Sequence, residues 1–106
     1  MNVLITSGPT REPIDTVRYI TNASSGRMGH AVAKAALAAG HNVTLLTGPT
    51  CLPAPAGATV ARFLSVADLR RELARHFDAC DALVMAAAVG DFTVRRRSDM
   101  KLRRSA

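Results

Sequence analysis

Residues 24–46 read SSGRMGHAVAKAALAAGHNVTLL, and this stretch decides the fold. Residues 27–39 within it are rich in alanine, the strongest helix former, and predict a helix. Its expected apolar stripe at helical spacing consists of Met28, Val32, Ala35, Ala36 and Ala39. Residues 42–46 (NVTLL) then predict a buried strand. A helix that leads straight into a β-branched strand indicates an α/β chain.

The pattern continues on both sides of this stretch. Residues 2–6 (NVLIT) predict a first buried strand, and residues 11–23 show neither the helical nor the strand period. We therefore expect a long loop there, and loops of that length in compact domains are usually functional. Residues 47–58 are rich in proline and glycine and predict another loop, followed by a weaker strand at residues 59–63.

Both predicted helices have capping signals at their ends. Ser24 or Ser25 is the candidate N-cap of the first helix, and Gly40 suits the position just beyond its C-terminus. Residues 65–68 (SVAD) resemble a capping box and predict a second helix that runs to about residue 77. The apolar stripe of this helix is expected at Val66, Leu69, Leu73 and Phe77.

A continuous apolar run at residues 82–88 (ALVMAAA) fits a central strand of a parallel sheet. The element order predicts an α/β fold, a Rossmann-like open, mostly parallel sheet of about four strands with one helix on each face. Two helices leave apolar sheet surface exposed unless something else covers it. We divide the chain into a Rossmann-like nucleotide-binding domain (residues 1–94) and a basic flap or tail, expected to be mobile (residues 95–106).

The charge of the chain lies mainly in that tail. The 106 residues have a net charge of +6, and residues 95–104 hold six basic side chains against one carboxylate. With no Trp, one Tyr and three Phe, a base-stacking surface is disfavoured, so we expect no nucleic acid partner. No apolar run approaches the ~18 residues of a membrane span, and the two cysteines lack metal-ligand spacing. We expect a cytoplasmic protein without a membrane partner.

Ligands of open parallel sheets bind outside the carboxyl ends of the strands. Three segments should converge there: residues 7–25, 47–49 and 86–91. Gly26 would let a phosphate approach the backbone, Gly29 would let helix and strand pack closely, and the helix N-terminus attracts anions. A small-residue helix start without a ligand is the alternative.

Longer motifs are more specific. The strings SGPTREPID (residues 7–15), VRYITN (17–22) and SSGRMG (24–29) resemble the signature of phosphopantothenoylcysteine synthetases, the ligases of coenzyme A synthesis. In many bacteria that domain follows a flavin-dependent decarboxylase. AAAVGDF (86–92) resembles the AAAVADY-type loop of the family, and MKLRR (100–104) resembles its K-I-K-K-like stretch.

The resemblance implies an enzyme that joins 4′-phosphopantothenate to cysteine. The substrate carboxylate attacks the α-phosphate of a nucleotide, CTP or ATP with CTP usual in bacteria, and pyrophosphate leaves. The cysteine amine then attacks the acyl-nucleotide, and CMP leaves. Mg²⁺ neutralises the phosphates. No flavin and no metal-ligating residue of the chain itself are expected.

The resemblance also implies residue roles. Asn22 matches the asparagine that contacts the acyl-nucleotide, and Lys101 matches the lysine of a flap that closes over it; these are the catalytic candidates. A helix-approach cap and a solvated charge, respectively, are the alternatives. Arg18 either pairs with an anion or braces the loop against Asp15. The nucleotide- or substrate-binding candidates are Gly8, Arg18, Ser24, Gly26, Gly29, Ala87, Ala88 and Asp91.

The chain also departs from the family pattern. Family domains are longer, and their second half supplies further strands, lysines for the triphosphate and part of the dimer contact. The fold is thus incomplete relative to the family, and we expect a truncated or split enzyme, inactive alone unless a homodimer or a partner chain supplies the rest. The alternative is a non-catalytic nucleotide-binding or assembly module that pairs with a partner chain.

Overall fold

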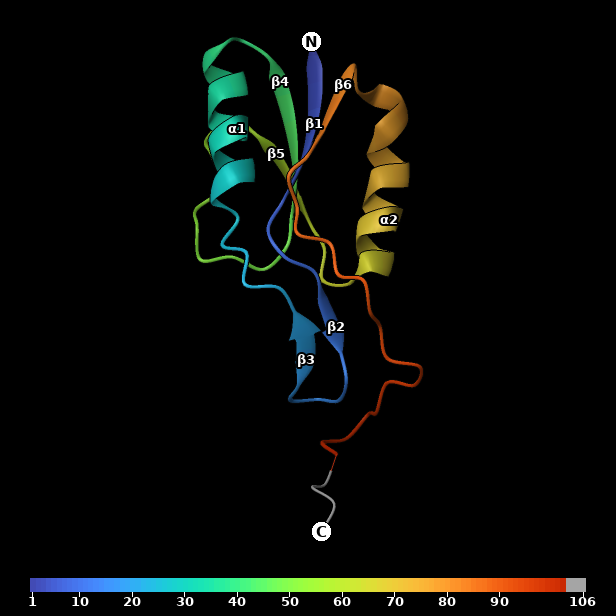
Figure 1. The fold of residues 1–106 in the computed structure, drawn as a ribbon. Coiled ribbons are helices and arrows are strands. Elements are labelled where there is room, and N and C mark those ends of the chain that lie inside the picture. Colours follow the sequence, from blue (N-terminus) through green and yellow to red (C-terminus); the bar gives the residue numbers. More distant parts are fainter. Residues whose placement is uncertain (103–106) are drawn as a thin grey trace.

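A computed structural model describes residues 1–102, and Arg103 and Arg104 of the basic stretch lie outside the described residues. Four strands form a parallel sheet in the order β5-β4-β1-β6 (Figure 1). This arrangement confirms the predicted Rossmann-like open sheet. The strands are β1 (Asn2–Ser7), β4 (Asn42–Thr47), β5 (Thr59–Arg62) and β6 (Ala82–Met85).

The two helices cover opposite faces of this sheet, as the right-handed crossovers predict (Figure 1). Helix α1 (Arg27–Ala38) packs against a cluster that includes Val3, Ile5 and Leu45. Helix α2 (Val66–His76) supplies Leu69 to a second cluster with Leu4. A short 3₁₀-helix, η1 (Phe77–Ala79), follows α2. Within residues 1–102, neither helix combines the length and apolarity needed to cross a bilayer.

The predicted serine cap of α1 is wrong, and the predicted stripe is right only in part, because Val32 and Ala36 pack against the core while the other members are exposed. Helix α1 buries Gly29, His30 and Ala33, whereas Met28 is 70% exposed. Alanine occupies so many positions of this helix that apolar periodicity alone cannot choose the buried face. The N-cap is Gly26 with a left-handed φ of 83° rather than a serine, while Gly40 with φ 89° ends the helix as predicted.

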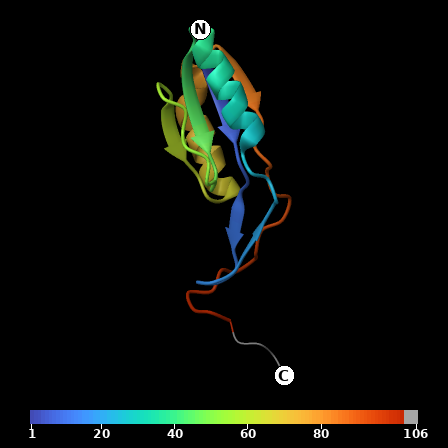
Figure 2. The same cartoon turned by 90° about the vertical axis from the view of Figure 1, so that its left-hand side faces the viewer.

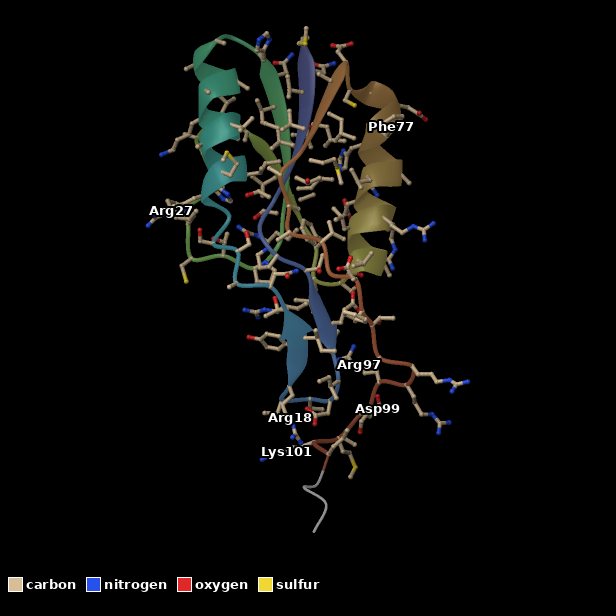
Figure 3. All side chains as sticks on the ribbon, viewed as in Figure 1. Arg18, Arg27, Phe77, Arg97, Asp99 and Lys101 are labelled. Atoms are coloured by element: carbon tan, nitrogen blue, oxygen red, sulfur yellow. The ribbon has the colours of Figure 1, made fainter. Side chains whose placement is uncertain are left out.

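The capping box of α2 is confirmed. The Ser65 hydroxyl accepts a hydrogen bond from the Asp68 amide at 3.1 Å, and the Asp68 carboxylate accepts one from the Ser65 amide at 3.1 Å. Leu69 is buried, but Phe77 is 55% exposed (Figure 3). The predicted stripe fails at Phe77 because α2 ends one residue earlier and the chain tightens into η1.

Strand β6 lies at the edge of the sheet and not at its centre, which corrects the prediction for residues 82–88. It ends at Met85, three residues earlier than expected. Leu83 pairs with Leu4, whose side chain lies on the α2 side, yet Leu83 and Met85 remain 36% and 52% exposed. The expectation that two helices would leave apolar sheet surface exposed is therefore confirmed.

The long loop expected at residues 11–23 is instead an antiparallel hairpin of β2 (Arg11–Pro13) and β3 (Tyr19–Thr21). Three-residue strands are too short to show a period in the sequence. The Asp15 carboxylate shapes the turn because it accepts hydrogen bonds from the amides of Val17 and Arg18. The hairpin extends beyond the carboxyl ends of the sheet, and residues 92–102 follow it in both views (Figures 1 and 2).

Candidate functional site

The three segments predicted to converge at the carboxyl ends of the strands do converge. The Gly48 amide donates a hydrogen bond to the Ser7 carbonyl at 2.9 Å, and the Ala88 amide donates one to the Gly8 carbonyl at 2.9 Å. Pro9 and Ala88 then continue the parallel pairing as an isolated bridge. Backbone from the ends of β1, β4 and β6 therefore meets in one place.

Glycines make this close approach possible. A Cβ atom at Gly29 would lie 2.3 Å from the Ser7 Cβ, so only glycine lets the first turn of α1 rest on the end of β1. The predicted role of Gly29 in helix–strand packing is confirmed. Gly8 has a φ of 82° and faces the Gly48 backbone, where its own Cβ would lie 3.3 Å from the Gly48 nitrogen.

A buried polar network fixes the turn that leads into α1. The Ser7 hydroxyl donates to the Gly26 carbonyl at 3.0 Å and lies 2.9 Å from Nδ1 of His30. The same Nδ1 lies 2.9 Å from the Gly26 carbonyl. Sequence reasoning passed over Ser7 and His30 as contributors to the site. The spacing of four residues between Gly26 and His30 was the available signal, because it places the ring against the first turn of the helix.

Asn22 joins the hairpin to the segment that follows β6. Its Nδ2 donates a hydrogen bond to the Ala88 carbonyl at 3.2 Å, across 66 residues of sequence. Nearby, the Thr21 hydroxyl donates to the Thr10 carbonyl at 2.7 Å and holds the end of β3 against the chain leaving β1. Ala87 and Ala88 are half-buried, while Asn22 and Asp91 are exposed. The structure thus brings Asn22 together with Ala87 and Ala88.

Beside this junction lies an open cleft of about 510 Å³, called here the arginine cleft. Three guanidinium groups and several hydroxyls line it, and no carboxylate among the described residues does. The lining residues are Arg11, Ser24, Ser25, Arg27, Pro49, Thr50, Cys51, Leu52 and Arg62. Arg27 stands at the start of α1, beside the glycine-rich turn (Figure 3). The arginines were missed because they come from three separate elements.

Arg11 leaves a donor unsatisfied at this cleft. Its guanidinium lies over the Tyr19 ring, 4.3 Å from the ring centroid. Its Nε is buried and has no hydrogen-bond partner within residues 1–102. A buried donor without an acceptor costs free energy, so the Arg11 side chain is held there at some cost to stability. Ser24, whose hydroxyl accepts from the Gly26 amide at 3.3 Å, lines the same cleft.

Arg18 braces the hairpin turn. Its Nε donates to Oδ2 of Asp15 at 3.2 Å, which is one of the two roles expected for it. Asp15 is 3% exposed, and hydrogen bonds from the amides of Leu102, Val17 and Arg18, together with the Arg18 charge, hold the pKa of its carboxyl well below the usual range. Asp15 is therefore ionised at neutral pH.

Among the candidates, Lys101 is brought to Arg18 but not to Asn22. It lies beside Arg18 at the far end of the hairpin (Figure 3), where the Arg18 guanidinium donates to the carbonyl of the next residue, Leu102. Arg18 precedes β3 and Asn22 follows it, so Lys101 and Asn22 lie at opposite ends of that strand. The two catalytic candidates are therefore separated in this structure.

Comparison with known proteins places these features in a family. The family model described as "DNA/pantothenate metabolism flavoprotein C-terminal domain" matches residues 1–106. The coenzyme A biosynthesis bifunctional protein CoaBC of Bacillus subtilis (strain 168) is 44% identical over 106 residues, covering 97% of this chain and 26% of the relative. The chain thus spans about a quarter of the length of that curated relative.

Solved structures show the same fold. The C-terminal domain of a CoaBC protein matches with a TM-score of 0.85 and 41% identity, over 90% of this chain and 48% of that one. A mutant of Cab2, solved in complex with phosphopantothenate-cysteine, matches with a TM-score of 0.83 at 23% identity, which shows likeness of fold. It covers 96% of this chain and 50% of that one. The resemblance inferred from the motifs is confirmed: the chain belongs to the family of the DNA/pantothenate metabolism flavoprotein C-terminal domain, the phosphopantothenoylcysteine synthetase part of CoaBC.

Proposed function

We propose that this chain forms the nucleotide-binding part of a phosphopantothenate–cysteine ligase of coenzyme A biosynthesis. The observation that carries the proposal is the hydrogen bond from Asn22 to the Ala88 carbonyl, because it unites two family motifs at the carboxyl ends of the strands. The substrates are 4′-phosphopantothenate, cysteine and a nucleoside triphosphate, with CTP preferred over ATP. The Cab2 structure with bound phosphopantothenate-cysteine supports the choice of phosphopantothenate and cysteine.

The reaction proceeds in two displacement steps. A carboxylate oxygen of phosphopantothenate attacks the α-phosphorus, the bond to the bridging oxygen breaks, and pyrophosphate leaves. The amine of cysteine then attacks the acyl carbon, loses a proton and displaces CMP. Positioning and charge stabilisation do most of the work in such transfers, so no nucleophilic side chain is needed.

The arginine cleft takes the phosphates in this proposal. Arg11, Arg27 and Arg62 face an open volume with no carboxylate to compete for them among the described lining residues. Phosphate oxygens would pair with the Arg11 guanidinium that lines the cleft, and the amides at the start of α1 attract the same charge. Gly26 is itself buried, and its φ of 83° admits the bend that leads into α1 beside the cleft.

The remaining candidates surround the reacting end of the nucleotide. The Asn22 amide can both donate and accept beside a mixed anhydride without adding charge. Ala87 and Ala88 are small, half-buried residues beside Asn22, and the exposed Asp91 offers an acceptor for hydroxyls or the base. Lys101 serves the flap and acts only after the segment that carries it leaves the hairpin.

Magnesium enters as the companion of the nucleotide. Mg²⁺ is usually held by carboxylates and phosphates, and the arginine cleft offers guanidinium groups and hydroxyls instead. Within residues 1–102, no group of three or more His, Cys, Asp or Glu side chains is arranged to hold a metal ion. The donor set does not fit a resident divalent cation, and no step of the proposal passes through one.

Calorimetry with CTP and with ATP tests the proposal. We expect Asn22→Asp to abolish or severely weaken binding, since a carboxylate cannot donate to the Ala88 carbonyl and repels phosphate. Ser24→Ala should weaken binding less. The matched control is Asn42→Asp, which makes the same change at the opposite end of the sheet, where Asn42 bonds to Asn2. Wild-type protein that binds neither nucleotide would refute the proposal.

A second candidate function is an assembly module that pairs with a partner chain. The exposed Leu83 and Met85 on the edge strand β6 favour it, because unpaired edges invite pairing. An assay of pyrophosphate release with phosphopantothenate and CTP separates the two functions. Release above background supports the ligase. Background release, together with an oligomer that Leu83→Glu dissociates, supports the module.

A further inference from the structure

Residues 92–102 lie along the hairpin and are attached to it at three separate points. The Thr93 hydroxyl donates to Oε2 of Glu12 at 3.0 Å. The Ser98 amide donates to the Ile14 carbonyl at 2.9 Å. At the hairpin tip, the Leu102 amide donates to Oδ2 of Asp15 at 2.8 Å. Successive residues of the hairpin thus hold successive residues of the segment.

At the hairpin tip, both backbone polar groups of Leu102 are hydrogen-bonded. Asp15 accepts from the Leu102 amide while the Arg18 guanidinium donates to the Leu102 carbonyl. Asp15 and Arg18 are themselves paired, so the two side chains form one rigid holder. Lys101 is the neighbour of the gripped residue, and its position is therefore set by this holder.

The attachment is polar and adds little apolar burial. Phe92 and Met100 are 75% and 74% exposed, and Leu102 is 47% exposed. A segment held by a few hydrogen bonds and few buried apolar contacts belongs to the part of a structure that opens most easily. These contacts keep residues 92–102 in one place but are few enough to break and release the segment.

The segment has a fixed base next to the site. The Ala88 amide bonds to the Gly8 carbonyl, and the Gly90 amide donates to the Thr10 hydroxyl at 2.9 Å. Movement would therefore begin after Gly90, close to the carbonyl that Asn22 contacts. Lys101 lies eleven positions after Gly90, and an extended chain of eleven Cα-to-Cα steps spans about 35 Å. A released segment is long enough to bring Lys101 back to Asn22.

We propose that Asp15 and Arg18 form a latch that holds residues 92–102 on the hairpin and keeps Lys101 away from Asn22 until the segment is released. The purpose of the release is closure of Lys101 over bound nucleotide, and this part of the proposal rests on the proposed function. Asp15 is then a positioning residue, and opening of the latch precedes closure of the site. The latch makes the state in which Lys101 covers the site a rarely populated one. A binding-competent state that is rarely populated lowers the apparent affinity for the ligand, so the latch weakens nucleotide binding.

Asp15→Asn tests the latch selectively. The asparagine Oδ1 can still accept from the turn amides, as asparagine does in such turns, but its Nδ2 cannot accept from the Leu102 amide. Thr93→Val is the second variant, since it removes the bond to Glu12 and leaves the hairpin untouched. Asp99→Asn is the matched control, because it makes the same chemical change at an exposed carboxylate of the same segment (Figure 3).

Amide hydrogen exchange is the first measurement. We expect exchange at Ser98 and Leu102 to rise about tenfold in Asp15→Asn and less in Thr93→Val, with β1 and β4 unchanged. The first variant loses the acceptor for the Leu102 amide and also the charge that holds Arg18 against the Leu102 carbonyl, whereas the second loses one hydrogen bond. Trypsin cleavage at Arg95–Arg97 should accelerate in parallel. Unchanged exchange and cleavage in both variants would overturn the latch.

Nucleotide affinity is the second measurement. We expect Asp15→Asn to tighten CTP binding severalfold and Lys101→Ala to remove that gain in the double variant, an effect that a structural role for Asp15 would not produce. Faster exchange without a change in affinity would overturn the gating role. If wild type and variants all fail to bind nucleotide, the proposed function is refuted, and the exchange data still decide whether the latch exists.

Discussion

Gly29 rests directly on Ser7, with no space for a side chain between helix α1 and the end of β1. A Cβ atom at position 29 would lie 2.3 Å from the Ser7 Cβ and 2.4 Å from its hydroxyl oxygen. The same hydroxyl donates to the Gly26 carbonyl, so the contact also fixes the turn beside the arginine cleft. This one approach sets both the packing of the helix and the shape of the candidate phosphate site.

Gly29→Ala should destabilise the protein strongly. The gain in helix propensity of roughly 1 kcal/mol favours alanine, whereas overpacking against a buried strand costs about 1–3 kcal/mol and also displaces the Ser7 hydroxyl. We expect the clash to win by about 1–2 kcal/mol, measured by urea denaturation. Gly40→Ala is the comparison, since its Cβ meets no described atom within 4 Å and its cost arises from a φ of 89°. A Gly29→Ala protein as stable as wild type would contradict the contact.

Much of the fold could be predicted because its signals are local. The run of residues 2–6, the alanine-rich helix and the capping box at Ser65 each identify an element by themselves, and the crossover rule then assigns the helices to opposite faces. The convergence of loops at the carboxyl ends of the strands follows from the same topology. Asn22 and Ala88 could therefore be expected near one another without coordinates.

The errors arise where the answer depends on distant contacts. The buried face of α1 is chosen by Ser7 and the sheet, which the helix's own alanine pattern cannot show. The position of β6 at the edge depends on strand order, because an apolar run fits an edge strand with one uncovered face as well as a central one. The location of Lys101 depends on Asp15, a residue 86 positions earlier in the chain.

Ser65→Ala should cost about 1 kcal/mol of unfolding free energy, because it removes the acceptor for the Asp68 amide at the start of α2. The equivalent change at Ser25 is the informative control. Ser25 was a predicted N-cap of α1, but Gly26 occupies that position, so Ser25→Ala should stay within about 0.5 kcal/mol of wild type. Chemical denaturation of both variants checks the difference. Equal losses of unfolding free energy in the two variants would show that Ser25 caps α1.

Stability should fall in acid because two carboxyl pKa values are lowered by folding. The Leu102 and Val17 amides lower the pKa of Asp15, and the Ser65 amide lowers that of Asp68. Their stabilisation is complete above the unfolded-state pKa of about 4 and is lost as pH falls through the lower folded-state values. Denaturation at pH 7, 5 and 3 should show little change between the first two and a clear loss at the third.

Asp15→Asn separates the contribution of Asp15 from that of Asp68 in the denaturation experiment at the three pH values. The variant lacks the titration at the hairpin, so its loss of stability between pH 5 and pH 3 should be smaller than that of wild type. Asp99→Asn, which alters an exposed carboxylate, should keep the wild-type dependence. An acid loss that is identical in wild type and Asp15→Asn would show that the hairpin carboxylate does not contribute.

Arg62→Ala should weaken binding of inorganic triphosphate, used as a probe of the arginine cleft without base or ribose. Arg62 ends β5 and lines the cleft, so its loss removes one of three guanidinium groups. A charge-assisted hydrogen bond to phosphate is worth about 1.5–3 kcal/mol, which corresponds to at least a tenfold loss of affinity by calorimetry. Arg62→Lys keeps the charge but loses bidentate geometry, and we expect it to recover part of that loss.

The salt dependence distinguishes a built cleft from general attraction to a basic chain. Arg70→Ala removes the same charge from an exposed position on α2, outside the cleft. At low salt both variants should bind triphosphate less well, since the net charge falls equally. At about 0.15 M salt, where charges more than ~8 Å apart are largely screened, only Arg62→Ala should remain impaired. Equal impairment of the two variants at that salt concentration would assign the binding to net charge and leave the cleft without a phosphate site.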